Sequence, residues 1–152
     1  MKITKIGHCC LAIEEQGIKM LTDPGAFSNC QNEVTDIDIV LITHEHPDHL
    51  HIESLKTILT NNPNAMVITN TSVGKILDEH QIKYNVVEDG GSLIIKEIEI
   101  KGFGKEHADI YKTITPVQNT GYLISGRLFY PGDAFCNPNM PVDILALPVA
   151  GP

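Results

Sequence analysis

The sequence predicts one α/β domain, because strands open the chain, strand–helix units follow, and strands return at the end. A chain of 152 residues suits one compact domain and is long enough to bury a core. We find no internal repeat, low-complexity tract or linker that would divide it. We therefore expect a single domain over residues 1–152.

Strand-like segments fill the first part of the chain. Residues 2–6, 9–13 and 18–22 are rich in apolar and β-branched side chains, and the third segment runs into a turn signal at 23–25. Residues 37–43 are almost continuously apolar, which is typical of a strand that is buried on both faces.

Two helical segments alternate with strands in the middle. Residues 50–59 carry apolar side chains at a helical period and predict the first helix. Residues 66–69 predict a short strand. Asn70-Thr71-Ser72 is a plausible cap for a second helix that ends near His80, and residues 84–87 predict the next strand.

The second half of the chain is rich in strands. Residues 93–100 predict one strand with imperfect alternation. Residues 121–124 and 128–130 flank a turn signal at 125–127 and predict a hairpin. Residues 143–149 are apolar and predict the last strand.

Composition excludes several classes of function. The net charge is −8 and no block of Lys or Arg is present, so we expect no nucleic-acid or membrane partner. No apolar run reaches the roughly 18 residues that span a bilayer, and we see no signal peptide, so we expect a cytoplasmic location. The four cysteines lack CxxC spacing, and we interpret them as small hydrophobic residues in a reducing compartment.

The strongest motif is HEHPDH at residues 44–49, which directly follows the predicted buried strand. His44 and His46 are two apart in an extended segment, so their side chains point the same way. Pro47 keeps His46 out of the helical region. Asp48 could cap the following helix, but this structural role leaves the massed histidines without a packing reason.

This spacing indicates a metal site. Ligands at the end of a strand project into the crevice where open α/β sheets bind their ligands. His44 and His46 face one point, whereas Asp48 and His49 follow a turn and can face a second point nearby. Imidazole and carboxylate groups together suit zinc, iron or manganese, and such a cradle fits two divalent ions.

The strand followed by HxHxDH resembles the metallo-β-lactamase superfamily of metal-dependent hydrolases, over essentially the whole chain. The opening Gly7-His8-Cys9-Cys10 resembles the branch that includes the ascorbate-6-phosphate lactonase and many uncharacterised zinc-dependent hydrolases. The resemblance implies an αββα sandwich with two divalent ions, and zinc is the expected metal, with manganese and iron as alternatives.

The resemblance also implies the roles of single residues. It implies that one ion is bound by His44, His46 and His107, that the second is bound by Asp48 and His49, and that Asp133 lies between them. Asp48 is also the candidate catalytic residue, because it can orient the nucleophile. Asp23 resembles an early aspartate that supports the motif loop, and His8 either lines the site or makes a structural hydrogen bond.

The C-terminal segment departs from the family pattern. The family completes its second metal site with a histidine that follows one more helix and strand, whereas no histidine follows His107 here. We therefore expect a sandwich that is incomplete at the C-terminus and a second ion that is bound weakly. We also expect an exposed apolar edge near residues 144–149, where another copy of the chain could associate.

The predicted reaction is metal-assisted hydrolysis of an ester, lactone or phosphoester. A metal-bound water with a pKa near 7 would become the hydroxide nucleophile. Two divalent ions outweigh the charges of Asp48, Asp133 and one hydroxide, so a small anionic substrate is expected. The alternatives are a truncated or inactive metal-binding module, a sulfur dioxygenase-like oxidoreductase and a nuclease. Di-iron oxygen reductases of this fold tend to carry Glu at the position of His46, which disfavours that class.

Overall fold

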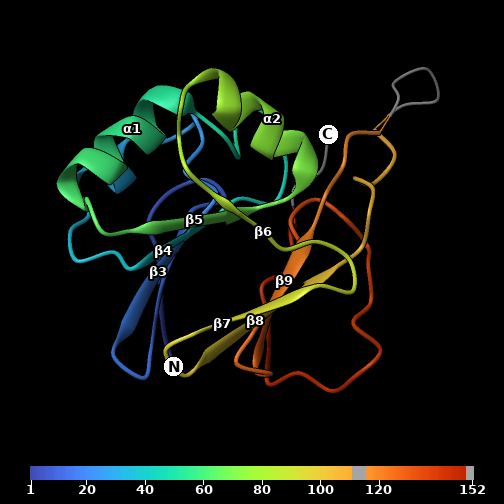
Figure 1. Cartoon of the computed structure of the whole chain (residues 1–152). Helices are drawn as coiled ribbons and strands as arrows, with labels where there is room; N and C mark the ends of the chain where they lie inside the picture. Colours follow the sequence, from blue (N-terminus) through green and yellow to red (C-terminus); the bar gives the residue numbers. More distant parts are fainter. Residues whose placement is uncertain (111–115, 150–152) are drawn as a thin grey trace.

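Two β-sheets face each other in the computed structural model of the chain, which describes residues 1–110 and 116–149 (Figure 1). Helix α1 (Ile52–Asn61) and helix α2 (Thr71–Glu79) cover the outer face of the first sheet. The layers are therefore helices, first sheet and second sheet, which confirms the predicted α/β class. In the described part of the chain, the outer face of the second sheet carries no α-helix.

The first sheet has the strand order β1-β2-β3-β4-β5-β6. Its strands are β1 (Lys2–Lys5), β2 (Leu11–Glu15), β3 (Ile18–Thr22), β4 (Ile39–Leu41), β5 (Met66–Thr69) and β6 (Asn85–Val86). The first three strands pair antiparallel, whereas β3 to β6 pair parallel. A parallel pair needs a crossover, and α1 and α2 provide the crossovers from β4 to β5 and from β5 to β6.

The second sheet has the strand order β11-β10-β9-β8-β7. Its strands are β7 (Ser92–Ile95), β8 (Ile98–Phe103), β9 (Gly121–Ile124), β10 (Leu128–Tyr130) and β11 (Ile144–Leu145). All of its pairs are antiparallel except the short pair of β10 with β11. The predicted hairpin over residues 121–130 is confirmed.

Several predicted strands differ in the structure. The strands predicted over 9–13, 37–43 and 84–87 have the bounds of β2, β4 and β6, and two others differ more. Residues 93–100 form two strands, β7 and β8, because Lys96 adopts a left-handed conformation with φ of 55° and reverses the chain. The sequence offers no glycine or asparagine there to indicate a turn. The strand predicted over 143–149 is reduced to β11, and residues 150–152 of the predicted C-terminal segment lie outside the described residues.

Strand β4 explains how the core is divided. Ile39 and Leu41 pack in the cluster between the sheets, whereas Val40 and Ile42 pack in the cluster under the helices. Successive side chains of a strand point to opposite faces, so a continuous apolar run is what a strand buried on both faces requires. Each buried side chain of this kind contributes about 1.5–3 kcal/mol. The strand is therefore held rigidly at the point where the histidine motif begins.

The ends of several strands meet at one edge of the sandwich. Asp23 follows β3, His44 follows β4 after two residues, Asn70 follows β5, and Asp133 follows β10. The hydroxyl of Tyr122 in the second sheet donates to the carbonyl of Ile42 at 3.0 Å and links the two sheets at this edge. We refer to this edge as the site end.

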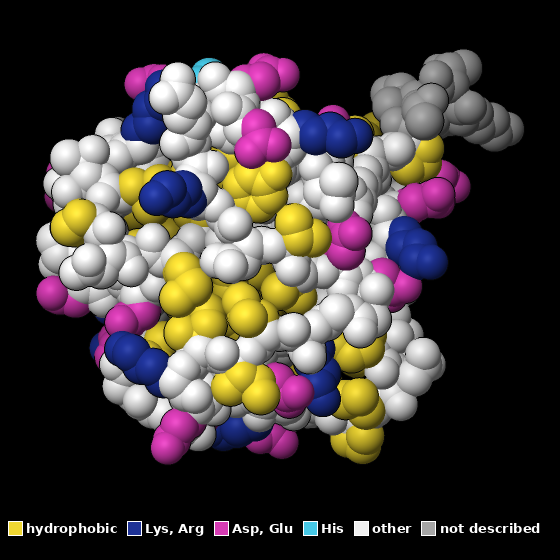
Figure 2. Space-filling model, viewed as in Figure 1, with side chains coloured by type: hydrophobic (Ala, Val, Ile, Leu, Met, Phe, Trp, Pro, Cys, Tyr) yellow, Lys and Arg dark blue, Asp and Glu magenta, His cyan; other side chains and the backbone are white. Residues whose placement is uncertain are grey.

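The side of the sandwich that Figure 1 presents, with α1 and α2 at the top, has a mixed surface. Figure 2 shows acidic and basic side chains around this face and hydrophobic side chains gathered near its middle. Among the helices of the described residues, none combines the length and the apolar character that a bilayer crossing requires.

Candidate metal centre

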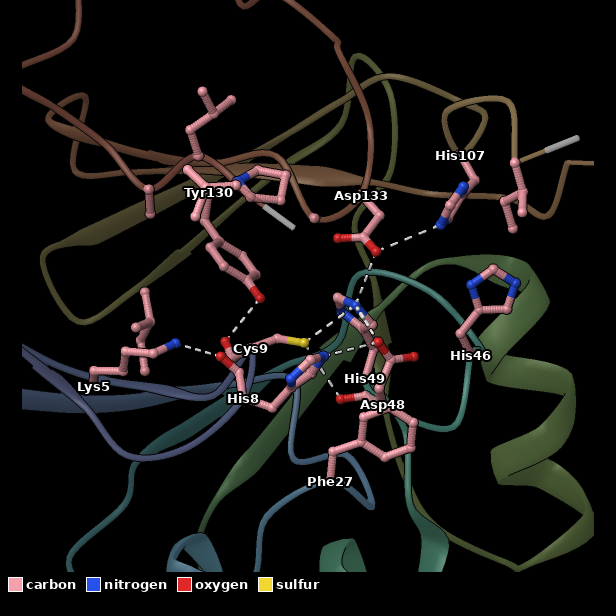
Figure 3. Close-up of a pocket in the computed structure, with 17 residues that line it drawn as sticks. Lys5, His8, Cys9, Phe27, His46, Asp48, His49, His107, Tyr130 and Asp133 are labelled. Atoms are coloured by element: carbon pink, nitrogen blue, oxygen red, sulfur yellow. Dashed lines mark hydrogen bonds and ion pairs between the residues drawn. The ribbon is translucent and has the colours of Figure 1, made fainter. Parts of the chain in front are cut away.

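A cavity of about 800 Å³ opens at the site end (Figure 3). The predicted site residues that line it are His8, His46, Asp48, His49, His107 and Asp133. His44 is fully buried beneath it, and Asp23 is fully buried behind the motif. The structure therefore gathers side chains from distant segments around one cavity.

His44, His46 and His107 form the first group. One ring nitrogen from each lies within 4.8 Å of the other two. The Nε2 atom of His44 is 3.1 Å from the Nδ1 atom of His46, and the ring of His107 lies against both rings. The structure thus brings His107, from the segment after β8, to the motif after β4.

Hydrogen bonds set the tautomers of this group. Nδ1–H of His44 donates to the hydroxyl of Thr43 at 2.9 Å, and Nδ1–H of His107 donates to the carbonyl of Ala108 at 2.6 Å. The Nε2 lone pairs of both rings are therefore free to bind a ligand. Nε2 of His107 is also buried with no hydrogen-bond partner among the described residues.

The unpaired Nε2 atom of His107 is the observation that tests whether a metal ion fits the first group. A buried polar atom without a partner costs about 1–3 kcal/mol, so native structures rarely keep one. Burial, together with the neighbouring histidines, holds the pKa of His44 well below its ordinary value. Burial and His107 lower the pKa of His46 as well. Neutral imidazoles that face one point are the donor set that a divalent transition metal requires.

A second group surrounds Nε2 of His49. This atom lies 3.3 Å from Oδ2 of Asp133 and 3.5 Å from Oδ2 of Asp48. Asp133 is also 3.6 Å from Nε2 of His107, so it stands between the two groups. Nε2 of His8 contacts Oδ2 of Asp48 at 3.2 Å, which places His8 at the cavity wall.

Asp23 supports this second group from behind. Its carboxylate accepts hydrogen bonds from the backbone N–H and the hydroxyl of Thr43, both at 2.8 Å, and from Nδ1–H of His49, also at 2.8 Å. The hydroxyl of Tyr130 donates to it at 2.7 Å. Asp23 therefore orients His49 so that Nε2 faces the cavity.

The charges around His49 indicate whether the second group of residues fits a metal ion. Burial lowers the pKa of His49, but Asp23 and Asp133 outweigh burial and raise the pKa to about 12. The ring therefore carries a proton on Nε2 between carboxylates when no metal is bound. A divalent cation at the same place would satisfy these carboxylates with more positive charge, so the residues of this group also fit a metal.

Close backbone packing holds the motif loop. The N–H of Ala26 donates to the carbonyl of Pro47 at 2.7 Å, and a Cβ atom added to Gly25 would lie 1.8 Å from the carbonyl oxygen of Asp48. Gly25 was predicted as part of a turn, and the structure shows that it also allows two loops to touch. Asn119 accepts from the N–H of Asp133 at 3.1 Å and positions that residue.

Sequence reasoning missed several contributors. Tyr130 and Asn119 are buried polar residues that support the centre, and no motif indicates either of them. The interpretation of the four cysteines as buried hydrophobic residues is right for Cys10, which is fully buried in the core. It is wrong for Cys30, which is exposed, and for Cys9 and Cys136, which are only half-buried. Cys9 lines the cavity, at the end of the bend over residues 7–9 that precedes β2.

Comparisons with known proteins identify the family of the chain. A family model described as the beta-lactamase superfamily domain matches residues 2–152. The Mycobacterium tuberculosis protein Rv0786c is 36% identical over all of this chain and 73% of its own length. The UPF0173 metal-dependent hydrolase of Carboxydothermus hydrogenoformans is 29% identical over 99% of this chain and 73% of its own length.

A solved structure shows the same fold. A protein from Parabacteroides distasonis, assigned as a metal-dependent hydrolase, superimposes with a TM-score of 0.79. It is 25% identical, and the match covers 99% of this chain and 70% of that protein. The chain therefore belongs to the metallo-β-lactamase superfamily of metal-dependent hydrolases.

Proposed function

We propose that this chain hydrolyses a small anionic ester, lactone or phosphoester with a centre of two zinc ions. In this proposal His44, His46 and His107 hold the first ion, Asp48 and His49 hold the second, and Asp133 bridges them. The observation that carries the proposal is the unpaired, buried Nε2 of His107, in a group where one ring nitrogen of each histidine lies within 4.8 Å of the other two. A merely structural histidine cluster would not leave this atom unpaired.

In this proposal, the residues at the cavity have different roles in the reaction. Divalent ions bound here would lower the pKa of a bound water to about 7 and polarise the bond to be cleaved. The Asp48 carboxylate is partly exposed to the cavity, so it can accept a hydrogen bond from the attacking water and orient it. Asp23 keeps His49 in one orientation throughout, because its carboxylate is fully buried and fully hydrogen-bonded.

The remaining cavity wall supports the proposed substrate class. Lys5 lines the cavity and places an ammonium group near its wall. Leu11, Phe27, Ile110 and Leu147 supply apolar surface beside it. A small molecule with an anionic group and an apolar portion fits this combination of charge and apolar lining.

Metal content and hydrolysis together test the proposal. The purified chain, dialysed against zinc and analysed for bound metal, should retain zinc and should cleave at least one compound in a panel of anionic lactones, esters and phosphoesters. Chelation should remove both the metal and the activity, and added zinc should restore both. Failure to bind any divalent metal would overturn the proposal, whatever the panel shows.

A further inference from the structure

A thiol lies beside the second group of ligands. The Sγ atom of Cys9 is 3.3 Å from Nε2 of His49 (Figure 3). Sγ also lies within 4.8 Å of a carboxylate oxygen of Asp48 and a ring nitrogen of His8. No sequence motif marks Cys9 as a ligand, because it belongs to neither a CxxC pair nor the histidine motif.

The distances around His49 match the edges of a coordination shell. Ligands bound to zinc at 2.0–2.3 Å in a tetrahedron are separated by roughly 3.3–3.7 Å. From Nε2 of His49, the separations are 3.3 Å to Cys9 Sγ, 3.5 Å to Asp48 Oδ2 and 3.3 Å to Asp133 Oδ2. The three separations from His49 therefore have the length that a tetrahedral set requires, and Sγ of Cys9 lies within 4.8 Å of a carboxylate oxygen of Asp48.

Cys9 is held in place by its own backbone. Its carbonyl accepts a hydrogen bond from the hydroxyl of Thr22 at 3.3 Å and lies 3.0 Å from the hydroxyl of Tyr130, whose single proton is shared with the closer carboxylate of Asp23. Cys10 next to it is buried in the core under the helices and anchors the segment on the opposite side. The thiol therefore faces the cavity as a consequence of the fold, as the carboxylates of Asp48 and Asp133 do.

We propose that Cys9 binds the second cation as a thiolate, together with Asp48, His49 and Asp133. The inference rests on the proposed metal centre and defines its second half. Binding releases the thiol proton to solvent and forms one sulfur–metal bond, so no oxidant is needed. A thiolate favours zinc, cadmium and cobalt over manganese and magnesium, so this half of the centre should select soft divalent metals.

A structural role for Cys9 makes a different prediction. Sγ is 3.5 Å from the carbonyl oxygen of Asp48, and a thiol that only donates a weak hydrogen bond there would stay protonated with metal present. Absorption spectroscopy of the cobalt-loaded chain separates the two roles. A cobalt–thiolate bond gives a charge-transfer band in the near ultraviolet, whereas cobalt bound by imidazole and carboxylate gives only weak visible bands.

The test compares the wild-type chain with Cys9→Ser and with Cys30→Ser, whose thiol is exposed away from the cavity. With two equivalents of cobalt, the near-ultraviolet band should appear in the wild type and Cys30→Ser and vanish in Cys9→Ser. Visible bands from the histidine group should remain in all three. A wild type that binds two cobalt ions without the band would overturn the inference, as would a band that survives in Cys9→Ser.

Alkylation of the wild-type chain provides a second measurement that needs no variant. Cadmium should protect Cys9 from iodoacetamide at least tenfold and leave Cys30 unprotected, as read by mass spectrometry of the peptides. Equal labelling of Cys9 with and without bound cadmium would contradict thiolate binding. A chain that binds no cobalt or cadmium at all would instead refute the proposed function, so the two failures are distinguishable.

Discussion

The two ends of the sandwich differ in whether their polar side chains are buried or exposed. The site end buries polar side chains such as Asp23, Thr43, His44 and Asn119, and nearly all of their polar atoms have partners. The other end, which we call the hairpin end, consists of the tight turns at residues 16–17, 96–97 and 125–126 with ion pairs at the surface. Burial strengthens electrostatic interactions, whereas solvent screens them. Substitutions at the site end should therefore have far larger effects.

The largest effect is expected at the first group of ligands. His46→Ala removes one of three nitrogen ligands, so zinc affinity at this group should fall more than about 100-fold and hydrolysis should be lost. His80→Ala, at the C-terminal cap of α2 and away from the cavity, is the matched control and should change neither. Equal zinc retention in both variants, measured by elemental analysis, would contradict the assignment.

Asp23→Asn should reduce both stability and metal binding. An amide in place of the buried carboxylate removes the charge opposite His49 and cannot accept from all of Thr43, His49 and Tyr130. The free energy of unfolding should fall by about 3 kcal/mol, and the second metal should bind about 10–100-fold more weakly. Urea denaturation and metal titration measure the two effects. Asp143→Asn, at an exposed carboxylate of the hairpin end, should change neither by a comparable amount.

Substitutions at two glycines should distinguish an effect on metal affinity from an effect on the free energy of unfolding. Gly25→Ala would force a Cβ atom against the backbone of Asp48, so the motif loop must shift and metal affinity should fall about tenfold or more. Gly17→Ala, in the turn at residues 16–17, has open space but φ of 76°. Strain there should cost about 1 kcal/mol of unfolding free energy and leave metal affinity unchanged. Similar metal affinities in the two variants would show that the contact of Gly25 with the motif does not matter.

The smallest effect is expected at Glu15 of the hairpin end. A hydrogen bond from the N-terminal amine lowers the pKa of Glu15, burial opposes this, and Arg127 lowers the pKa further. Because the folded-state pKa lies below the unfolded value of about 4.5, the unfolded chain takes up the proton more readily. The stabilisation by the Glu15 carboxylate is therefore fully present above about pH 4.5 and is lost as the pH falls through the folded-state pKa.

Glu15→Gln should therefore lower stability at neutral pH by less than Asp23→Asn and should weaken the loss of stability in acid. Urea denaturation of both chains at neutral and acidic pH measures the difference. Metal affinity at neutral pH should be the same as in the wild type, because Glu15 lies at the hairpin end. A Glu15→Gln chain with the wild-type pH dependence would show that this carboxylate titrates equally in both states.

Much of the fold could be predicted because its signals are local. The run over residues 37–43 predicted a buried strand, and the polar segment 70–72 predicted the start of α2, whose N-cap is Asn70. The hairpin at Lys96 could not be predicted, because a lysine rather than a glycine takes the left-handed conformation there. Its cause is tertiary: Ser92 to Ile95 pair with β8, which in turn pairs with β9.

Some of the candidate ligands could likewise be predicted from a local pattern, whereas others depend on the tertiary structure. The sequence by itself determined the predicted site around His44, His46, Asp48 and His49, because three histidines and an aspartate within six residues of a strand end have no packing role there. Their role as ligands, like that of His107 and Asp133, stays a prediction. Only the tertiary structure decided that His107 and Asp133 reach the motif, because they follow strands of the other sheet.

Tertiary structure alone also decided the support of the centre. Asp23 and Tyr130 contact each other from opposite sheets, and Cys9 faces His49 although their positions in the sequence are far apart. A hydrogen bond or a coordination shell depends on where atoms lie in space, whereas a motif records only neighbours along the chain. The short-range pattern therefore determined which ligand types the predicted site offers, and the packing of the two sheets determined which further side chains surround them.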